Sequence, residues 1–216
     1  MLCSAGLDSA VLLADEARRG PVVPVYVSVG LAWEAAERRM LARLLEARVF
    51  SGVAPPASLS FDMRDVYPPT HWAVRGAPPA YDTPDEDVYL AGRNLVLLAK
   101  AGVLCAQRQL GRVALGPLAG NPFPDATPDF FAAMGRALSL GLAHGIEIAT
   151  PLATMHKEDV IRLGAALGVP FELTLSCMNP RADSHCGECS KCRERHDGFI
   201  AAGLPDPTAY VAAPPR

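Results

Sequence analysis

Four cysteines near the C-terminal end most strongly limit what this chain can fold into. Cys186, Cys189 and Cys192 form two overlapping C-x-x-C units, and Cys177 precedes them by a short stretch. Four thiolates can complete the tetrahedral shell of Zn²⁺, and a shell that protein ligands fill completely is structural. We predict a structural zinc site with four cysteine ligands here, since this spacing favours metal binding over free cysteines or disulfides. His185 is an alternative ligand that four thiols make unnecessary.

The bulk composition narrows the class of protein further. The chain has 216 residues, 50% of them hydrophobic, and a formal net charge of −3. These values fit one domain with a small appendage and argue against duplex nucleic acid as a stable partner. A metal-type cysteine cluster is typical of a reduced, cytoplasmic protein. No apolar run approaches the ~20 residues that span a bilayer, so we expect no membrane segment.

Hydrophobic spacing alternates between strand-like and helix-like stretches. A β-branched run predicts a strand at 22–29, and shorter stretches predict strands at 59–63, 113–116 and 146–149. Helical periodicity predicts helices at 9–19, 32–48, 94–110, 128–142 and 156–167. Such an alternation predicts an α/β fold with a mainly parallel sheet. Residues 64–88, rich in proline, aspartate and aromatic side chains, should form a long loop that is functional or mobile.

Side-chain patterning also predicts which way residues of the helix at 32–48 face. Its apolar positions, Trp33 and Met40 among them, should face the core. Glu34 and Glu37 should face the solvent on the opposite side of the helix.

The N-terminal end of the chain carries a candidate phosphate loop, Ser4-Ala5-Gly6-Leu7-Asp8-Ser9. Gly6 would let the backbone approach an anion closely, and a helix that starts near Ser9 presents free N–H groups to it. A pyrophosphate group would fit there, and Asp8 would repel that anion unless it binds Mg²⁺ or orients another group. The alternative is a turn that merely starts a helix. The loop matches neither the Walker A pattern nor G-x-G-x-x-G.

Very little of the chain precedes this loop. A phosphate loop in a doubly wound fold normally follows a buried strand, and here only Met1, Leu2 and Cys3 come before it. Either the first strand is very short, or the start of the protein lies upstream of Met1.

These motifs resemble those of the ATP pyrophosphatases (PP-loop enzymes), whose loop is S-G-G-x-D-S. Together with the cysteines, they resemble the 7-cyano-7-deazaguanine synthase branch of that family, over essentially the whole chain. The other matching segments are Ala91-Gly92-Arg93-Asn94, Asn121-Pro122-Phe123-Pro124-Asp125 with Asp129-Phe130-Phe131, Pro151-Leu152 with Lys157-Glu158, and Thr174-Leu175-Ser176-Cys177.

Two departures from the family pattern stand out. Ala5 replaces the first glycine of the loop, and an alanine would be strained there if the backbone is left-handed. Ala126 and Thr127 replace the family's Cys-Arg in the substrate segment, which weakens the implied recognition of a deazaguanine more than the implied ATP chemistry.

The resemblance implies a Rossmann-like fold of the adenine nucleotide alpha hydrolase type, with a mainly parallel sheet and helices on both faces. Residues 1–170 would form the PP-loop nucleotide-binding domain. Residues 171–216 would form a small C-terminal zinc segment, with the four cysteines as ligands, packed on that domain. The resemblance also implies a homodimer.

The activity that the resemblance implies is that of an ATP-dependent carbon–nitrogen ligase. In this branch the carboxylate of 7-carboxy-7-deazaguanine attacks the α-phosphorus of ATP, pyrophosphate leaves, and ammonia displaces AMP to give an amide. A second ATP activates the amide oxygen, and loss of AMP gives 7-cyano-7-deazaguanine on the route to queuosine. The implied cofactors are ATP with Mg²⁺ and a structural Zn²⁺.

The resemblance also implies roles for particular residues. Asp8 would lie near Mg²⁺, and Arg93 and Lys157 would hold phosphate or carboxylate charge. Asp125 would bind the guanine-like edge or Mg²⁺. The residues implied to be catalytic are Asp8, Arg93, Lys157 and Asp125, and those implied to bind nucleotide are Ser4, Ala5, Gly6, Leu7, Asp8, Ser9, Arg93 and Asn94. The alternatives are a surface arginine, a solvated lysine and a loop Asx-turn for Arg93, Lys157 and Asp125 respectively.

Two other functions stay open at this point. One is a PP-loop enzyme that adenylates a different carboxylate, on a small molecule, on tRNA or at a protein terminus. The other is a zinc-stapled module that binds ATP without turnover. The mildly acidic composition argues against a tRNA-binding relative, and the intact Asp8, Arg93 and Lys157 argue against a module without turnover.

Overall fold

The centre of the fold is a parallel sheet in two halves that the N-terminal residues join. A computed structural model describes residues 1–215. In it β1 (Val25–Ser28) pairs in parallel with β2 (Ala57–Ser60), and β3 (Arg112–Ala114) pairs in parallel with β4 (Glu147–Ala149). Arg216, the last residue of the predicted segment 171–216, lies outside the described residues.

Leu2 lies between the two strand pairs and makes them one layer. The N–H of Leu2 donates to the carbonyl of Ala114 at 2.9 Å, and the N–H of Cys3 donates to the carbonyl of Val25 at 2.9 Å. Leu2 also forms a parallel bridge with Val25. The order across the sheet is therefore β2, β1, Leu2, β3, β4. The residues before the phosphate loop occupy the central strand position.

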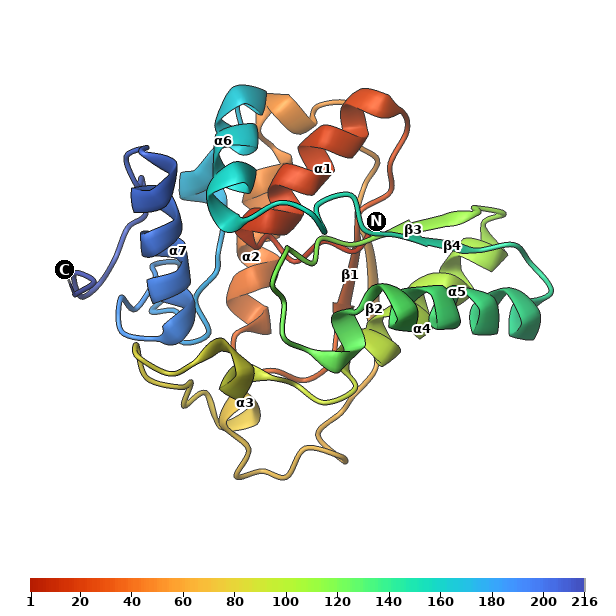
Figure 1. Ribbon diagram of the computed structural model, residues 1–216, viewed down its shortest axis with the longest axis horizontal. Helices are drawn as coiled ribbons and strands as arrows, with labels where there is room; N and C mark the ends of the chain where they lie inside the picture. Colours follow the sequence, from red (N-terminus) through yellow and green to blue (C-terminus); the bar gives the residue numbers. More distant parts are fainter. Residues whose placement is uncertain (216) are drawn as a thin grey trace.

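Helices cover both faces of this sheet (Figure 1). In that view α1 and α6 lie above β3 and β4, and α4 and α5 lie below them. The α-helices are α1 (Leu7–Arg19), α2 (Glu34–Leu45), α3 (Trp72–Arg75), α4 (Arg93–Gln107), α5 (Pro128–Leu142), α6 (Lys157–Leu167) and α7 (Ser190–Ala202). Short 3-10 turns occur at Arg48–Phe50, Asp85–Val88, Pro124–Ala126 and Phe171–Leu173. The predicted α/β class, with parallel strands and helices, is confirmed.

The predicted strands and helices all occur, but several bounds differ from expectation. The first strand starts at Val25 and the second spans Ala57–Ser60, although the N–H groups of Phe61 and Met63 still donate to the carbonyls of Ser28 and Val29. The stretch 64–88 contains α3 and a 3-10 turn. Helix α7, which starts directly after Cys189, was not predicted. No helix within residues 1–215 is long and apolar enough to cross a membrane.

The largest hydrophobic core joins the two ends of the chain. It contains Leu12 of α1, Ile161 of α6 and Phe199 of α7 together with the four clustered cysteines. Two glycines allow the close packing: a Cβ at Gly164 would lie 2.6 Å from a Val11 methyl, and a Cβ at Gly198 would lie 2.5 Å from Cγ of Lys157. Helix α6 is thus held closely between α1 and α7.

One helix ends on a residue with an unfavourable backbone. Helices α6 and α7 end at Gly168 and Gly203 in the left-handed conformation, which glycine adopts without a Cβ penalty. Helix α5 ends in the same way at the exposed Ala143, with φ 48°. An L-residue in that conformation costs roughly 1–2 kcal/mol.

We predict that Ala143→Gly stabilises the protein by up to about 1 kcal/mol, because it removes this strain at an exposed position. The measurement is urea unfolding at neutral pH. The control is Ala137→Gly, exposed inside the same helix, which should destabilise by about 1 kcal/mol. Destabilisation by both changes would contradict the assigned backbone strain.

Candidate active site

The phosphate loop is held in shape by its own serines. The Ser9 hydroxyl donates to the carbonyl of Gly6 at 2.9 Å, and the N–H of Gly6 donates to the Ser4 hydroxyl at 3.3 Å. Helix α1 follows directly, and no side chain caps its first turn. Its first N–H groups and the positive end of its dipole are therefore left for an anion.

Ala5 adopts the left-handed backbone under which an alanine is strained, with φ 65°, and is completely buried. The expected strain at this substitution is therefore present. The carbonyl of Ala5 accepts a hydrogen bond from the N–H of Leu175 at 2.9 Å. This bond attaches the loop to the segment that leads into Cys177.

Lys157, the first residue of α6, lies between two carboxylates. Its Nζ is 2.8 and 2.7 Å from the two Asp8 oxygens and 2.6 Å from Oε1 of Glu194. Burial alone would lower the pKa of Lys157, but Asp8 and Glu194 outweigh it and raise the pKa. Lys191 pairs with the other oxygen of Glu194. Burial would raise the pKa of Glu194, and the two lysines instead lower it.

Arg93 and Asn94 begin α4 directly after Gly92. The backbone N–H of Asn94 donates to Oδ2 of Asp125 at 3.1 Å, and its side-chain amide donates to the Asp125 carbonyl at 2.9 Å. Asp125 thus anchors the start of α4. Burial raises the pKa of Asp125, while Asn94 and Arg93 oppose the shift. Nε of Arg93 is buried with no hydrogen-bond partner among the described residues.

These residues surround two adjoining cavities of about 260 and 290 Å³. The residues that line both are Ser4, Gly6, Asp8, Glu37, Arg93, Asn94 and Phe123. Leu7, Asp125 and Lys157 line the first cavity, and Ser9 lines the second. Of the residues predicted to be catalytic or to bind nucleotide, Ala5 is the one that lines neither cavity. Four segments distant in the sequence therefore converge on one site.

The prediction that Glu34 and Glu37 face the solvent was wrong, since both are buried. Glu34 accepts hydrogen bonds from the N–H of Val29 at 2.7 Å and from the Ser28 hydroxyl. Glu37 accepts one from the Tyr26 hydroxyl at 2.9 Å. Its position carried a usable signal. Glu37 is four residues after Trp33, which places it on the apolar face of α2.

Burial raises the pKa of Glu37 from 4.5 to about 7, against the opposing effects of Arg93 and Tyr26. Glu37 is only 7% exposed, so the effect of burial on its pKa outweighs the opposing effect of the Arg93 guanidinium.

The four cysteines form a compact, buried group whose sulfurs all lie within 4.8 Å of one another. Sγ of Cys189 is 3.9 Å from that of Cys177 and 3.6 Å from that of Cys192, and Cys186 is 3.8 Å from Cys192. A tetrahedral site with Zn–S bonds of about 2.3 Å needs sulfurs about 3.8 Å apart. The group therefore fits a metal ion of this kind.

Backbone N–H groups point at these sulfurs. Cys186 and Asn179 donate to Sγ of Cys177, and Glu188 donates to Sγ of Cys186. Such bonds favour the thiolate form that a metal needs. His185 is not in the group. Its Nε2 accepts from the N–H of Ser176 at 3.0 Å, and burial lowers its pKa to about 3.

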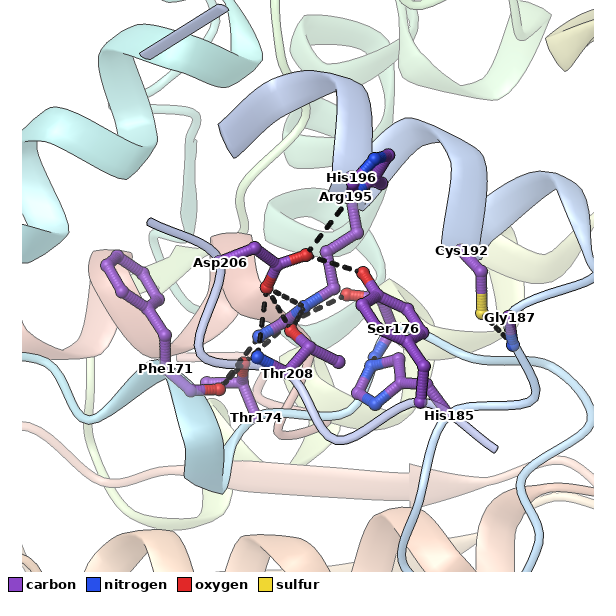
Figure 2. A network of polar contacts seen from close by, with 11 residues as sticks. Phe171, Thr174, Ser176, His185, Gly187, Cys192, Arg195, His196, Asp206 and Thr208 are labelled. Carbon is purple, nitrogen blue, oxygen red and sulfur yellow. Dashed lines mark hydrogen bonds and ion pairs between the residues drawn. The ribbon is translucent and has the colours of Figure 1, made fainter. Parts of the chain in front are cut away.

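Arg195, three residues after Cys192, connects the metal site to the C-terminal tail (Figure 2). It is only 1% exposed and donates to Thr208 at 2.5 Å, to Thr174 at 2.8 Å and to the Phe171 carbonyl at 2.8 Å. The structure shows a buried cross-link, because backbone and hydroxyl oxygens of residues 171–176 and of Thr208 surround the guanidinium.

The tail itself packs over the cysteines. The N–H of Val211 donates to the carbonyl of His185 at 2.9 Å, and that of Ala212 donates to Cys186 at 3.1 Å. A Cβ at Gly187 would lie 1.8 Å from the Ala212 carbonyl, so glycine is needed there.

The fold and the site define a class: an α/β protein with a candidate phosphate loop before its first helix and four clustered cysteines that could hold a metal ion after its last strand. A family model described as queuosine biosynthesis protein QueC matches residues 74–203. The chain belongs to this QueC family.

Curated relatives named 7-cyano-7-deazaguanine synthase match nearly the full chain. The protein from Methanopyrus kandleri is 34% identical over 98% of this chain and 97% of its own length. The protein from Methanoculleus marisnigri is 34% identical over 97% of this chain and 96% of its own length. The protein from Dechloromonas aromatica is 31% identical over 98% of this chain and 97% of its own length.

We predict about one zinc ion per purified chain, and loss of both zinc and folded structure in Cys189→Ser. Elemental analysis and circular dichroism measure the two. The control is Cys105→Ser, which changes a buried cysteine outside the group and should leave the zinc content unchanged. A metal-free Cys189→Ser protein that melts at the wild-type temperature would show that the site contributes nothing to folding.

We also predict that Glu37→Gln changes how stability depends on pH. Folding raises the pKa of this carboxyl, so its contribution to the free energy of unfolding is lost as pH rises through the folded pKa. The free energy of unfolding of the wild type should therefore decrease between about pH 4.5 and pH 7. The wild type should therefore be on the order of 3 kcal/mol less stable than the variant at pH 8, and nearly equal to it at pH 4.5. Urea unfolding at both pH values tests this, with Glu46→Gln at the exposed end of α2 as control.

Proposed function

We propose that this chain is an ATP-dependent carbon–nitrogen ligase that converts 7-carboxy-7-deazaguanine and ammonia into 7-cyano-7-deazaguanine through adenylated intermediates. One observation carries the proposal most directly. The phosphate loop, Arg93 and Lys157 converge on the same pair of cavities in a member of the QueC family. Carboxylate activation needs such a set of groups, because negative charge develops on the phosphates as pyrophosphate leaves.

At the phosphate end, Ser4, Gly6 and Ser9 would hold the pyrophosphate together with the N-terminus of α1. Lys157 would contact the same anion, since its present partner Asp8 lies in the loop itself. Asp8 would hold Mg²⁺, which neutralises phosphate charge when bound. The side chains of Asp8 and Lys157 thus offer a carboxylate for the metal ion and an ammonium for the phosphate.

At the other wall, Arg93 would bind the α-phosphate or the substrate carboxylate. Its buried Nε has no hydrogen-bond partner within residues 1–215, so a ligand oxygen would satisfy it. Asp125, anchored by Asn94, would accept N–H groups from the guanine-like edge. Trp33, Trp72 and Phe123 also line the first cavity and suit a flat ring.

The remaining features follow from the same proposal. Four thiolates would saturate a Zn²⁺ ion, so its role would be structural. Residues 171–216 would serve as the zinc segment of the nucleotide-binding domain 1–170. We further propose a cytoplasmic homodimer whose other substrates are ammonia and ATP.

A second candidate is an enzyme of the same chemistry that activates a different carboxylate. Thr127, which departs from the family pattern, uses its hydroxyl to cap α5 by accepting from the N–H of Phe130 at 3.2 Å. A side chain committed to a helix cap is less available for the substrate. AMP release with another acid, and none with the deazaguanine acid, would support this candidate.

We predict that the protein with ATP, Mg²⁺, ammonium and 7-carboxy-7-deazaguanine releases AMP and pyrophosphate and gives a nitrile product by mass spectrometry. Lys157→Met should lower kcat/KM by about 100-fold or more, since it removes a cation at the developing charge. Lys100→Met, on α4 outside both cavities, is the matched control. ATP binding without AMP release from any acid would favour the module without turnover.

A further inference from the structure

Glu37 places a carboxyl group at the wall that the two cavities share. It is the residue of α2 that lines both of them, beside Ser4, Asp8 and Arg93. A ligand that spans the two cavities therefore passes this side chain, and a reacting group held by Arg93 is close to it.

A carboxyl at this place is not explained by packing. Its neighbours on the same face of α2, Met40, Leu41 and Leu44, belong to the hydrophobic core. Burying an acid among such residues costs free energy, and one hydrogen bond from Tyr26 only partly offsets that cost. An acid kept in a buried site beside a ligand cavity indicates a functional role.

The groups around Glu37 come from four elements. They are Tyr26 of β1, Glu34 of α2, Arg93 of α4 and Cys3 of the central strand. Burial is the strongest influence and brings the pKa of Glu37 to about 7, with Arg93 opposing and Glu34 reinforcing the shift. A group that titrates near neutral pH can both take and release a proton efficiently during turnover.

The other carboxylates of the first cavity are already engaged. Asp8 and Glu194 are paired with Lys157, and Asp125 accepts hydrogen bonds from Asn94. Within residues 1–215, Glu37 is the carboxyl lining both cavities that has no cation in ion-pair contact.

We propose that Glu37 is the general base that removes protons from nitrogen during amide and nitrile formation. The inference rests on the proposed function and adds a residue to its chemistry.

The proton balance of the reaction explains why a base is needed. Ammonium loses one proton to become the nucleophile; its lone pair forms the C–N bond, the C–O bond to AMP breaks, and the nitrogen loses a second proton. In the next stage the amide oxygen bonds to the α-phosphorus and pyrophosphate leaves. The nitrogen then gives up its two remaining protons as the C–O bond breaks and AMP departs with the electron pair. Glu37 would accept these protons in turn and release each to water.

The first step, adenylation of the carboxylate, needs no base, because a carboxylate that attacks ATP loses no proton. It can therefore be compared with the later steps, which remove protons from nitrogen. Glu37→Gln keeps the size of the side chain and an oxygen for Tyr26. We predict that acid-dependent exchange of pyrophosphate into ATP falls less than about fivefold in this variant. Amide formation should fall by about 100-fold or more. The limb of its pH–rate profile near pH 7 should disappear.

A second variant tests the proposal even if Glu37→Gln misfolds. Tyr26→Phe removes the hydrogen bond that lowers the pKa of Glu37, so the limb near pH 7 should move to higher pH. An unmoved limb would assign it to another group and overturn the proposal. An equal loss of exchange and amide formation in Glu37→Gln would also overturn it, since Glu37 would then only position Arg93. Absence of exchange in the wild type would instead count against the proposed function.

Discussion

The ammonium of Lys157 is the point on which the arrangement of this site depends. It lies at the start of α6 and contacts Asp8 of α1 and Glu194 of α7, so one charge joins three helices. Gly164 and Gly198 allow that approach, because larger side chains would push α6 away from its neighbours. These partly buried ion pairs fix where the three helices meet, while their net contribution to stability is small. Here that geometry places the N-terminus of α1 and the ammonium of Lys157 at the same cavity.

The cysteine site extends this arrangement into the C-terminal segment. The chain that leaves Cys192 presents Glu194 to Lys157 and Arg195 to the residues around Thr174. On the other side of the cysteines, Leu175 is bonded to the backbone of Ala5 in the phosphate loop. A metal at the thiolates would therefore hold two walls of the ligand cavity while remaining away from the reacting atoms. An ion held there would support a site that it does not enter.

Much of the site was predictable because its residues belong to short, local motifs. The phosphate loop, Arg93 with Asn94, and the cysteines each occur as a contiguous pattern whose chemistry follows from the residue types. Glu37 and Glu194 have no such pattern. Glutamates on predicted helices are usually solvated, and their burial depends on which face of the helix meets another element. Arg195 follows Cys192 by three residues, but its buried bonds to Thr174 and Thr208 come from contacts across the fold.

The sequence by itself determined the alternation of strands and helices, and it predicted the grouping of the four cysteines, because these depend on periodicity and spacing within a few residues. Only the tertiary structure decided that Leu2 completes the sheet, that Lys157 lies between Asp8 and Glu194, and that Glu37 faces the cavities. The first two join residues far apart along the chain, and the spacing from Trp33 that puts Glu37 on the apolar face does not indicate which element covers that face. They arise from the packing of whole helices and strands, and their energies depend on burial that no single segment has alone.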